Sequence, residues 1–262
     1  MHEEEKSDPA IVAVKSANKA PVSTPGAAER MEPRAGTERN ADPQSMDRTQ
    51  SRAAVSQAQA RIREAALRNP REKLTALLHH VTVDTLRCAF LALRKRAAVG
   101  VDRVSWGDYA ADLERNLAGL AARVHRGAYR ALPSRRVFIP KSDGKLRPLG
   151  IAAIEDKIVQ AAVVTILTPI YEAAFLGFSY GFRPGRSQHQ ALDALAFGIK
   201  ARKVCWVLDA DISRFFDTID HDWLVRFMRH RVGDERIVRL IQKWLKAGVL
   251  EDGRLAETLE GT

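Results

Sequence analysis

Two cysteines in 262 residues are too few for a disulfide framework. Cys88 and Cys205 lie in apolar stretches without the paired spacing of a zinc site, which predicts two small buried core residues and a reducing, cytoplasmic location. The sequence has no run of about 18 apolar residues, so we expect no membrane span. The N-terminus, MHEEEKSDP, has no basic start followed by an apolar core, which argues against a secretory signal.

Large apolar side chains are scarce in residues 1–58, which are rich in Ala, Pro, Ser, Glu and Arg. Such a segment buries too little apolar surface to offset the entropy lost on ordering. We therefore predict a disordered tail over 1–58 and two further parts, 59–200 and 201–262.

Acidic residues are outnumbered, with 32 against 42 Lys and Arg, so the net charge is +10 and the pI is near 9.9. Residues 1–60 hold 8 basic and 9 acidic side chains, which leaves a net +11 for the rest of the chain. A pI above about 9 is typical of nucleic-acid binding, although a merely soluble basic protein has the same composition.

Apolar periodicity predicts an α+β protein. We expect two hairpins, around Asp143-Gly144 and Asp252-Gly253, and a buried strand over Val204–Ile212. The expected helices cover 82–98, 105–126, 154–175 with a bend or break at Pro169, a stretch from about Ser187, 220–231 and 234–247.

The first segment that suggests chemistry is FIPKSDGKLRPLGI, residues 138–151, on the first hairpin. A tight hairpin would bring Lys141, Lys145 and Arg147 close together. Cations on a rigid hairpin suit a phosphate group, and Arg can bind it through two hydrogen bonds. The alternative is a solvated basic hairpin without a ligand.

The second segment is YGFRPGRS, residues 180–187, a short stiff loop that enters a helix. Arg183 and Arg186 lie beside the positive end of that helix, an arrangement that attracts a phosphate backbone. The alternative is that both arginines pair with nearby carboxylates.

The third segment is VLDADISRFFD, residues 207–217. Alternation along a strand places Asp209 and Asp211 on one face. A carboxylate at the end of an apolar strand is costly unless it is paired or binds a metal, and polymerases use neighbouring carboxylates to hold two Mg²⁺ ions. A helix cap or a salt bridge is the alternative.

In this order, the three segments resemble group II intron reverse transcriptases, whose encoded proteins also act as maturases. Gly100-Val101-Asp102 with Tyr109, and Gly127-Ala128-Tyr129-Arg130, resemble the N-terminal extension of that family's fingers. The similarity covers roughly residues 70–262, and retron and CRISPR-linked enzymes share parts of it. It implies an N-terminal extension and mostly helical fingers with a β-hairpin over 59–200, followed by the first part of a palm sheet over 201–262.

The resemblance also implies roles for single residues. Asp211 matches the first metal-binding aspartate of the palm, with the backbone carbonyl of Ile212 as a second Mg²⁺ ligand. Phe216 matches the bulky gate that excludes a ribose 2′-hydroxyl. Lys141 and Arg147 match residues that hold the incoming triphosphate. Arg183 and Arg186 fall in a block near the template, and Asp209, Asp217 and Asp220 are expected to be structural.

The implied partners are an RNA template, with intron RNA foremost, a DNA primer and deoxynucleoside triphosphates. The sequence departs from the family after Gly261-Thr262, where the family continues into Pro-Gln-Gly and later Tyr-X-Asp-Asp. One aspartate cannot hold two Mg²⁺ ions in reactive geometry, so we expect no activity from this chain alone. A truncated product, a fragment or a piece completed by a second chain would each fit.

Two rivals remain for the isolated chain. One is a non-catalytic RNA-binding module, maturase-like, that grips intron RNA with its basic fingers. The other is a relic without function. The absent aspartates favour the first rival, whereas Phe216 and the triphosphate residues favour the polymerase.

Overall fold

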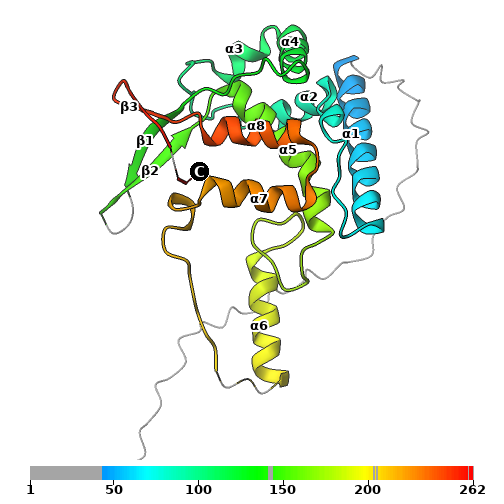
Figure 1. Ribbon diagram of the computed structural model, residues 1–262, viewed down its shortest axis with the longest axis vertical. Helices are drawn as coiled ribbons and strands as arrows, with labels where there is room; N and C mark the ends of the chain where they lie inside the picture. The colour runs from blue at the N-terminus through cyan, green and yellow to red at the C-terminus, as the bar shows by residue number, and fades with distance from the viewer. Residues whose placement is uncertain (1–42, 141–143, 203, 205, 259, 262) are drawn as a thin grey trace, which may run out of the picture. The chain divides into compact units, whose positions relative to one another are not determined.

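The computed structural model describes residues 43–140, 144–202, 204, 206–258 and 260–261 (Figure 1). This part of the chain is mixed helix and sheet, as predicted. Its elements are, in chain order, α1 (Pro43–Arg68), η1 (Leu78–His80), α2 (Val83–Ala92), α3 (Trp106–Ala110), α4 (Leu113–His125), β1 (Ser134–Pro140), β2 (Leu146–Ile151), α5 (Ile154–Glu172), α6 (Gln188–Arg202), η2 (Phe215–Asp217), α7 (His221–Arg231), α8 (Glu235–Leu245), β3 (Val249–Glu251) and β4 (Arg254–Ala256).

Helix α5 is at the centre of the core. Ten of its nineteen residues are buried, and their spacing places them over somewhat more than half of the helix circumference, whereas Val164 on the remaining face is 61% exposed. Helices α1 and α2 pack against it, and side chains from α4, α7 and α8 join the same apolar cluster. No described helix is both long enough and apolar enough to cross a bilayer.

Pro169 lies inside α5 and does not end it, because the helix continues to Glu172. A proline has no N–H, so the carbonyl of Thr165, one turn earlier, loses its helical partner. The side-chain amide of Gln59 on α1 donates to that carbonyl at 3.1 Å. Of the predicted bend or break, the break is therefore wrong, and α1 supplies the missing hydrogen bond.

Helix α1 corrects the predicted tail boundary, because residues 43–58 are helical. Its inner face carries mostly small side chains, such as Ser51, Ala58 and Ala66, so the apolar pattern is weak although Ala favours a helix. The Ser51 hydroxyl donates to Asp84 of α2 at 2.7 Å. The rest of the predicted tail, residues 1–42, lies outside the described residues.

Two other helices are shorter than predicted. Helix α2 ends at Ala92, where the indole of Trp106 stacks on Phe90 with ring centroids 4.6 Å apart and donates to the Phe90 carbonyl. The expected helix over 105–126 is divided into α3 and α4. Cys88 on α2 is only partly buried, contrary to the prediction, and Cys205 lies outside the described residues.

Both predicted hairpins form, and they join one four-stranded sheet of order β2-β1-β3-β4. Strands β1 and β2 are antiparallel, with Arg147 opposite Ile139, while β1 and β3 are parallel, with Ser134 opposite Val249. The second hairpin therefore extends the first, although more than ninety residues separate them in sequence.

The predicted buried strand over Val204–Ile212 is wrong. The described residues of this segment have no strand structure, and Trp206 and Leu208 are 91% and 90% exposed. A strand needs a neighbour for its backbone hydrogen bonds, and no described strand lies beside this one. Helix α6 stands apart from the helices around α5 in Figure 1, and none of its residues is buried.

Arg231, the last residue of α7, is 5% exposed and binds the C-terminal end of α1. Its guanidinium donates to the carbonyls of Ala66, Asn69, Pro70 and Glu72. The carbonyls at a helix C-terminus lack helical partners and carry partial negative charge, so a cation there stabilises the helix.

We predict that Arg231→Met lowers the free energy of unfolding by roughly 3 kcal/mol, because four carbonyls at the end of α1, that of Ala66 buried, lose a charged donor. Urea unfolding followed by circular dichroism measures this. The matched control is Arg229→Met. It removes a cation that lies two residues before Arg231 and forms an exposed ion pair with Glu235. Equal stability losses in the two variants would contradict the assigned role of Arg231.

Asp234 joins α8 to the segment before α2. Its carboxylate accepts hydrogen bonds from the backbone N–H groups of Leu77 and Leu78, both at 2.9 Å, and from Arg236. Burial alone would raise the pKa of Asp234, but these hydrogen bonds outweigh burial and lower the pKa to about 2.

A lowered carboxylate pKa contributes stability that is present above the unfolded-state pKa of about 4 and is lost as the pH falls towards 2. We predict that Asp234→Asn is less stable than wild type by about 2 kcal/mol at pH 7 and that the difference shrinks between pH 4 and pH 2. Urea unfolding across this range measures it. Asp193→Asn, at an exposed position on α6, is the control, and a pH-independent difference would contradict the prediction.

Candidate active site and nucleic-acid interface

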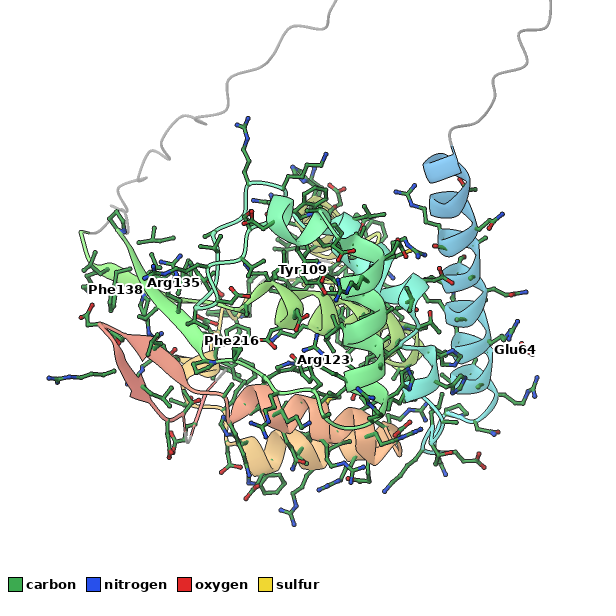
Figure 2. All side chains as sticks on the ribbon, turned by 90° about the horizontal axis from the view of Figure 1, so that it is seen from above. Glu64, Tyr109, Arg123, Arg135, Phe138 and Phe216 are labelled. Carbon is green, nitrogen blue, oxygen red and sulfur yellow. The ribbon has the colours of Figure 1, made fainter. Side chains whose placement is uncertain are left out.

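The first hairpin presents its basic motif to solvent. Arg147 on β2 is exposed, whereas Lys141 lies outside the described residues. At the base of the hairpin, the Arg135 guanidinium donates to the Val99 carbonyl at 2.8 and 3.1 Å, and Phe138 lies farther along β1 (Figure 2). The hairpin thus has a fixed base and an exposed outer part, as its predicted phosphate-binding role requires.

The Val99 segment rests directly on the start of α5. A Cβ at Gly100 would lie 2.5 Å from the Cα of Ala153, so only glycine fits this approach. Asp102 accepts from the backbone N–H of Ile154 at 3.4 Å. Gly100-Val101-Asp102 therefore positions the hairpin relative to α5.

Asp211, Ile212 and Phe216 lie on an exposed segment that ends in η2. One Asp211 carboxylate oxygen accepts from the backbone N–H of Ile212 at 2.9 Å. Ile212 and Phe216 are 68% and 61% exposed, and Phe216 meets Phe215 edge to face, with ring centroids 5.4 Å apart.

Gly261 fixes the turn that carries Phe216. Its backbone N–H donates to the Ile219 carbonyl at 2.9 Å, and its own carbonyl lies 2.7 Å from Nε2 of His221. A Cβ at Gly261 would meet the Phe216 carbonyl oxygen at 2.9 Å, and its φ is +82°. Nearby, Asp220 caps α7 by accepting from the Trp223 N–H at 2.8 Å, which confirms its predicted structural role.

The described residues do not assemble a two-ion metal site. No group of three or more potential His, Cys, Asp or Glu ligands occurs among them. Asp211 offers one carboxylate and Ile212 one carbonyl, whereas two Mg²⁺ ions need several oxygen ligands in fixed positions. The residues present therefore do not fit such a pair of ions by themselves.

Arg183 is occupied inside its own loop. Its guanidinium makes two 3.0 Å hydrogen bonds to the Glu172 carboxylate at the end of α5, and it also donates to the carbonyls of Leu176 and Ser179. Its side chain is 6% exposed and lies over the Phe175 ring at 4.8 Å. The hydrogen bonds from Arg183 lower the pKa of Glu172. This is the carboxylate pairing weighed as the alternative for the loop.

Arg186, three residues on, differs from Arg183 because it is exposed and lies over the Tyr180 ring at 5.6 Å. Ser187 then caps α6, with its hydroxyl accepting from the Gln190 N–H at 3.3 Å, which confirms the predicted start of this helix. Of the two arginines, Arg186 has the guanidinium that is open to a phosphate.

The Gly127-Ala128-Tyr129-Arg130 segment is held from two sides. The Tyr129 hydroxyl donates to the buried Asp156 carboxylate of α5 and accepts from the Trp244 indole of α8 at 2.9 Å. Burial raises the pKa of Asp156, and the hydrogen bond from Tyr129 opposes that rise. This arrangement fixes the segment between α5 and α8.

Glu155, the residue before Asp156 on α5, binds helices α3 and α4. Arg123 on α4 makes hydrogen bonds of 2.6 and 2.9 Å to it, and Tyr109 on α3 donates at 3.4 Å (Figure 2). Hydrogen bonding to Glu155 raises the pKa of Arg123 further above its usual value. The N-terminal motif residue Tyr109 therefore has a structural role.

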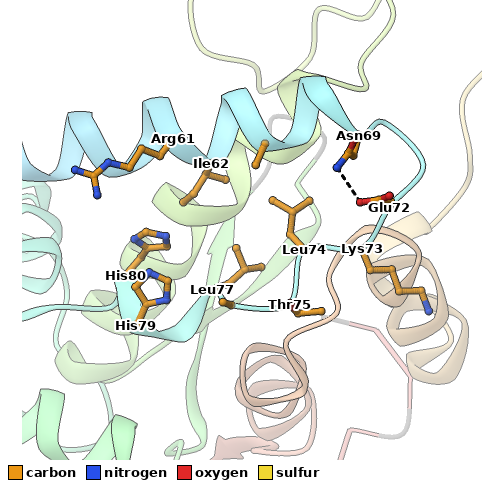
Figure 3. A pocket seen from close by; sticks show the side chains of 12 residues that line it. Arg61, Ile62, Asn69, Glu72, Lys73, Leu74, Thr75, Leu77, His79 and His80 are labelled. Atoms are coloured by element: carbon orange, nitrogen blue, oxygen red, sulfur yellow. Dashed lines mark hydrogen bonds between the residues drawn. The ribbon is translucent and has the colours of Figure 1, made fainter.

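A cavity of about 410 Å³ between α1 and the segment that follows it was not foreseen (Figure 3). Its wall includes Ile62, Leu77, His79 and His80, with the two imidazole centroids 3.8 Å apart. Burial lowers the pKa of His80, and the neighbouring His79 and Arg61 lower it further. No sequence motif indicated this cavity.

Comparison with known proteins places these segments in a family. Residues 139–261 match the sequence model of the family described as "Reverse transcriptase (RNA-dependent DNA polymerase)". Protein YkfC of Escherichia coli (strain K12) is 36% identical over 214 residues, which are 79% of this chain and 56% of that protein.

Two further relatives are named for introns. The group II intron-encoded protein LtrA of Lactococcus lactis subsp. cremoris is 41% identical over 137 residues, which are 52% of this chain and 22% of LtrA. The mitochondrial nuclear intron maturase 1 of Arabidopsis thaliana is 30% identical over 92 residues, or 35% of this chain and 13% of that protein.

Residues 139–261 therefore belong to the reverse transcriptase domain family, and every predicted site residue lies within them. More particularly, the homologues over about half of the chain are group II intron-encoded proteins and maturases, as the sequence motifs predicted. The chain spans 56% of YkfC and 22% of LtrA.

We predict different effects for the two loop arginines. Arg183→Gln and Glu172→Gln should each lower the melting temperature, and the double variant should be little worse than either, because both break one interaction. Arg186→Gln should leave the melting temperature unchanged and weaken RNA binding. Thermal melts and RNA titrations measure these effects. If Arg183→Gln melts at the wild-type temperature but binds RNA more weakly, the structural role assigned to Arg183 is wrong.

Proposed function

We propose that this chain is part of an RNA-directed DNA polymerase of the group II intron type. The whole enzyme would add deoxynucleotides to a DNA primer along an RNA template, with Mg²⁺. The observation that carries the proposal is the family match over residues 139–261, within which Arg147, Asp211, Ile212 and Phe216 are all exposed. A polymerase must present these groups to nucleotide and template, whereas a merely structural role would allow them to be buried.

The proposed roles follow from the chemistry of each group. Arg147 would bind the triphosphate, with Lys141 beside it, through charge-assisted hydrogen bonds. Phe216 would stand against the sugar and exclude a 2′-hydroxyl by its bulk. Asp211 and the Ile212 carbonyl are oxygen ligands suited to Mg²⁺, which supplies stabilisation of the attacking and leaving oxygens.

Further carboxylates are needed for that metal chemistry. Since no group of three potential ligands occurs among the described residues, we propose that the others come from polypeptide outside these 262 residues. A continuation of the same chain or a second chain could supply them. We therefore assign no catalytic step to this chain alone.

A second candidate function is an RNA-binding module without polymerase activity, maturase-like in its use of intron RNA. The net charge of +11 outside residues 1–60 favours it, because Lys and Arg that neutralise phosphates release counterions and give sequence-independent affinity. The two functions separate in one assay, because only the polymerase depends on Asp211.

We predict that the 262-residue chain does not extend a labelled DNA primer on an RNA template with Mg²⁺ and deoxynucleotides. Fused to a continuation that carries Pro-Gln-Gly and Tyr-X-Asp-Asp segments, it should extend the primer. In that fusion, Asp211→Asn should reduce extension at least about a thousandfold, as expected for the loss of a metal ligand and its electrostatic stabilisation. Phe216→Val should allow ribonucleotide incorporation.

The matched control is Asp209→Asn, two residues from Asp211 and also exposed, which should retain extension. Extension by the unfused chain would contradict the need for further carboxylates. Full activity of the fused Asp211→Asn protein would show that the metal site lies elsewhere. RNA binding by a fusion that never extends a primer would favour the binding module.

A further inference from the structure

A basic groove lies outside the three motif segments. Two adjoining cavities, of about 330 and 820 Å³, share Gly127, Arg239 and Lys243 in their walls. One wall is the end of α4 with the loop from Arg126 to Pro133, and the other is α8. We refer to these two cavities together as the α8 groove.

Positive charge dominates the α8 groove. Helix α8 and the residue after it contribute Arg236, Arg239, Lys243 and Lys246, at spacings of three, four and three residues, which place them along one face of a helix. The facing wall adds Arg126 and Arg130. The described residues that line the groove include no Asp or Glu.

One of these cations builds the groove. The Lys243 amine donates to the carbonyls of Gly127, at 3.0 Å, and Tyr129, and so joins α8 to the facing loop. Tyr129 is in turn anchored to Asp156 on α5 and to Trp244 on α8. These hydrogen bonds hold the two walls at a fixed separation, which preorganises the groove for a ligand.

The other cations face solvent. Arg126, Arg130, Arg239 and Lys246 are exposed, while Arg236 pairs with Asp234 at 3.2 Å. From Arg236 to Lys246 the α-helical rise of 1.5 Å per residue gives a stripe of about 15 Å. A nucleic-acid strand with one phosphate about every 3.4 Å along its axis would place about four phosphates against that length.

We propose that the α8 groove binds the phosphate backbone of RNA, at a place separate from the Asp211–Phe216 segment. The proposal rests on the proposed function for its ligand, because an RNA-directed polymerase or an RNA-binding module must hold RNA. A groove without carboxylates and with several exposed cations favours a polyanion. Its length favours a chain of phosphates over a single triphosphate.

The test is binding of a fluorescein-labelled RNA hairpin to the full 262-residue chain, followed by anisotropy over a series of KCl concentrations. The groove variant carries Arg126→Gln, Arg130→Gln, Arg239→Gln and Lys246→Gln, and Lys243 is kept because it joins the walls. We expect at least about tenfold weaker binding near 0.1 M salt and a slope of log K against log salt reduced by about three.

The matched control carries Arg63→Gln on α1, Arg68→Gln on α1, Arg94→Gln after α2 and Arg115→Gln on α4. It removes the same charge from exposed positions that do not line the groove. It should bind RNA nearly as tightly as wild type. Melting temperatures within a few degrees of wild type for both variants show that each is folded. If the melting temperature of the groove variant is much lower than that of wild type, the single variants Arg239→Gln and Lys246→Gln replace it.

Equal affinity and salt slope in the groove variant and the control would overturn the proposal. Displacement of the RNA by free deoxynucleoside triphosphate as readily as by unlabelled RNA would also overturn it, because the groove would then hold a small anion. Primer extension by the fusion protein distinguishes failure of the groove proposal from failure of the proposed function. If the fusion protein shows Asp211-dependent extension although the groove variant binds RNA as the control does, the proposed function stands and only the groove assignment is wrong.

Discussion

Burial of α5 is the constraint on which the rest of the described structure depends. A helix that buries more than half of its circumference must be covered on several sides, and α1, α2, α4, α7 and α8 all supply side chains to its surroundings. The acidic residues at its start are also engaged, with Glu155 bound to α4 and Asp156 to the Tyr129 segment. One helix therefore sets the positions of the first hairpin, helices α3 and α4, and α8.

That constraint divides the motif residues into two groups. The first group contacts α5 or its ends and builds the framework. It comprises Gly100, through close packing, and Tyr109, Tyr129 and Arg183, through their side chains. The exposed group, on the hairpin and on the segment before α7, has few contacts with that framework. A short motif can thus contain both kinds of residue, as the Arg183–Arg186 loop shows with an internal arginine three positions from an exposed one.

Features that depend on residues close together in sequence could be predicted, and features that depend on residues far apart in sequence could not. Both hairpins, the Ser187 cap and helices α7 and α8 depend on residues a few positions apart, and they were foreseen. Helix α1 was missed because its buried stripe is mostly Ser and Ala, and Pro169 was misjudged because its compensating partner, Gln59, is more than a hundred residues away. The prediction of a strand over Val204–Ile212 was wrong because apolar character alone does not provide a neighbouring strand. The α8 groove was not predicted because its two walls, with cations at 126–130 and 236–246, are more than a hundred residues apart in sequence.

The exposure of Trp206 has a practical consequence. An indole that is 91% exposed emits as it would in water, whereas Trp106 and Trp244 are packed against aromatic neighbours or hydrogen-bonded inside the fold. Any polypeptide or nucleic acid that covers the segment around Leu208 would transfer Trp206 to a less polar environment and shift its fluorescence to shorter wavelength. The protein therefore carries an intrinsic optical reporter on the exposed segment before η2.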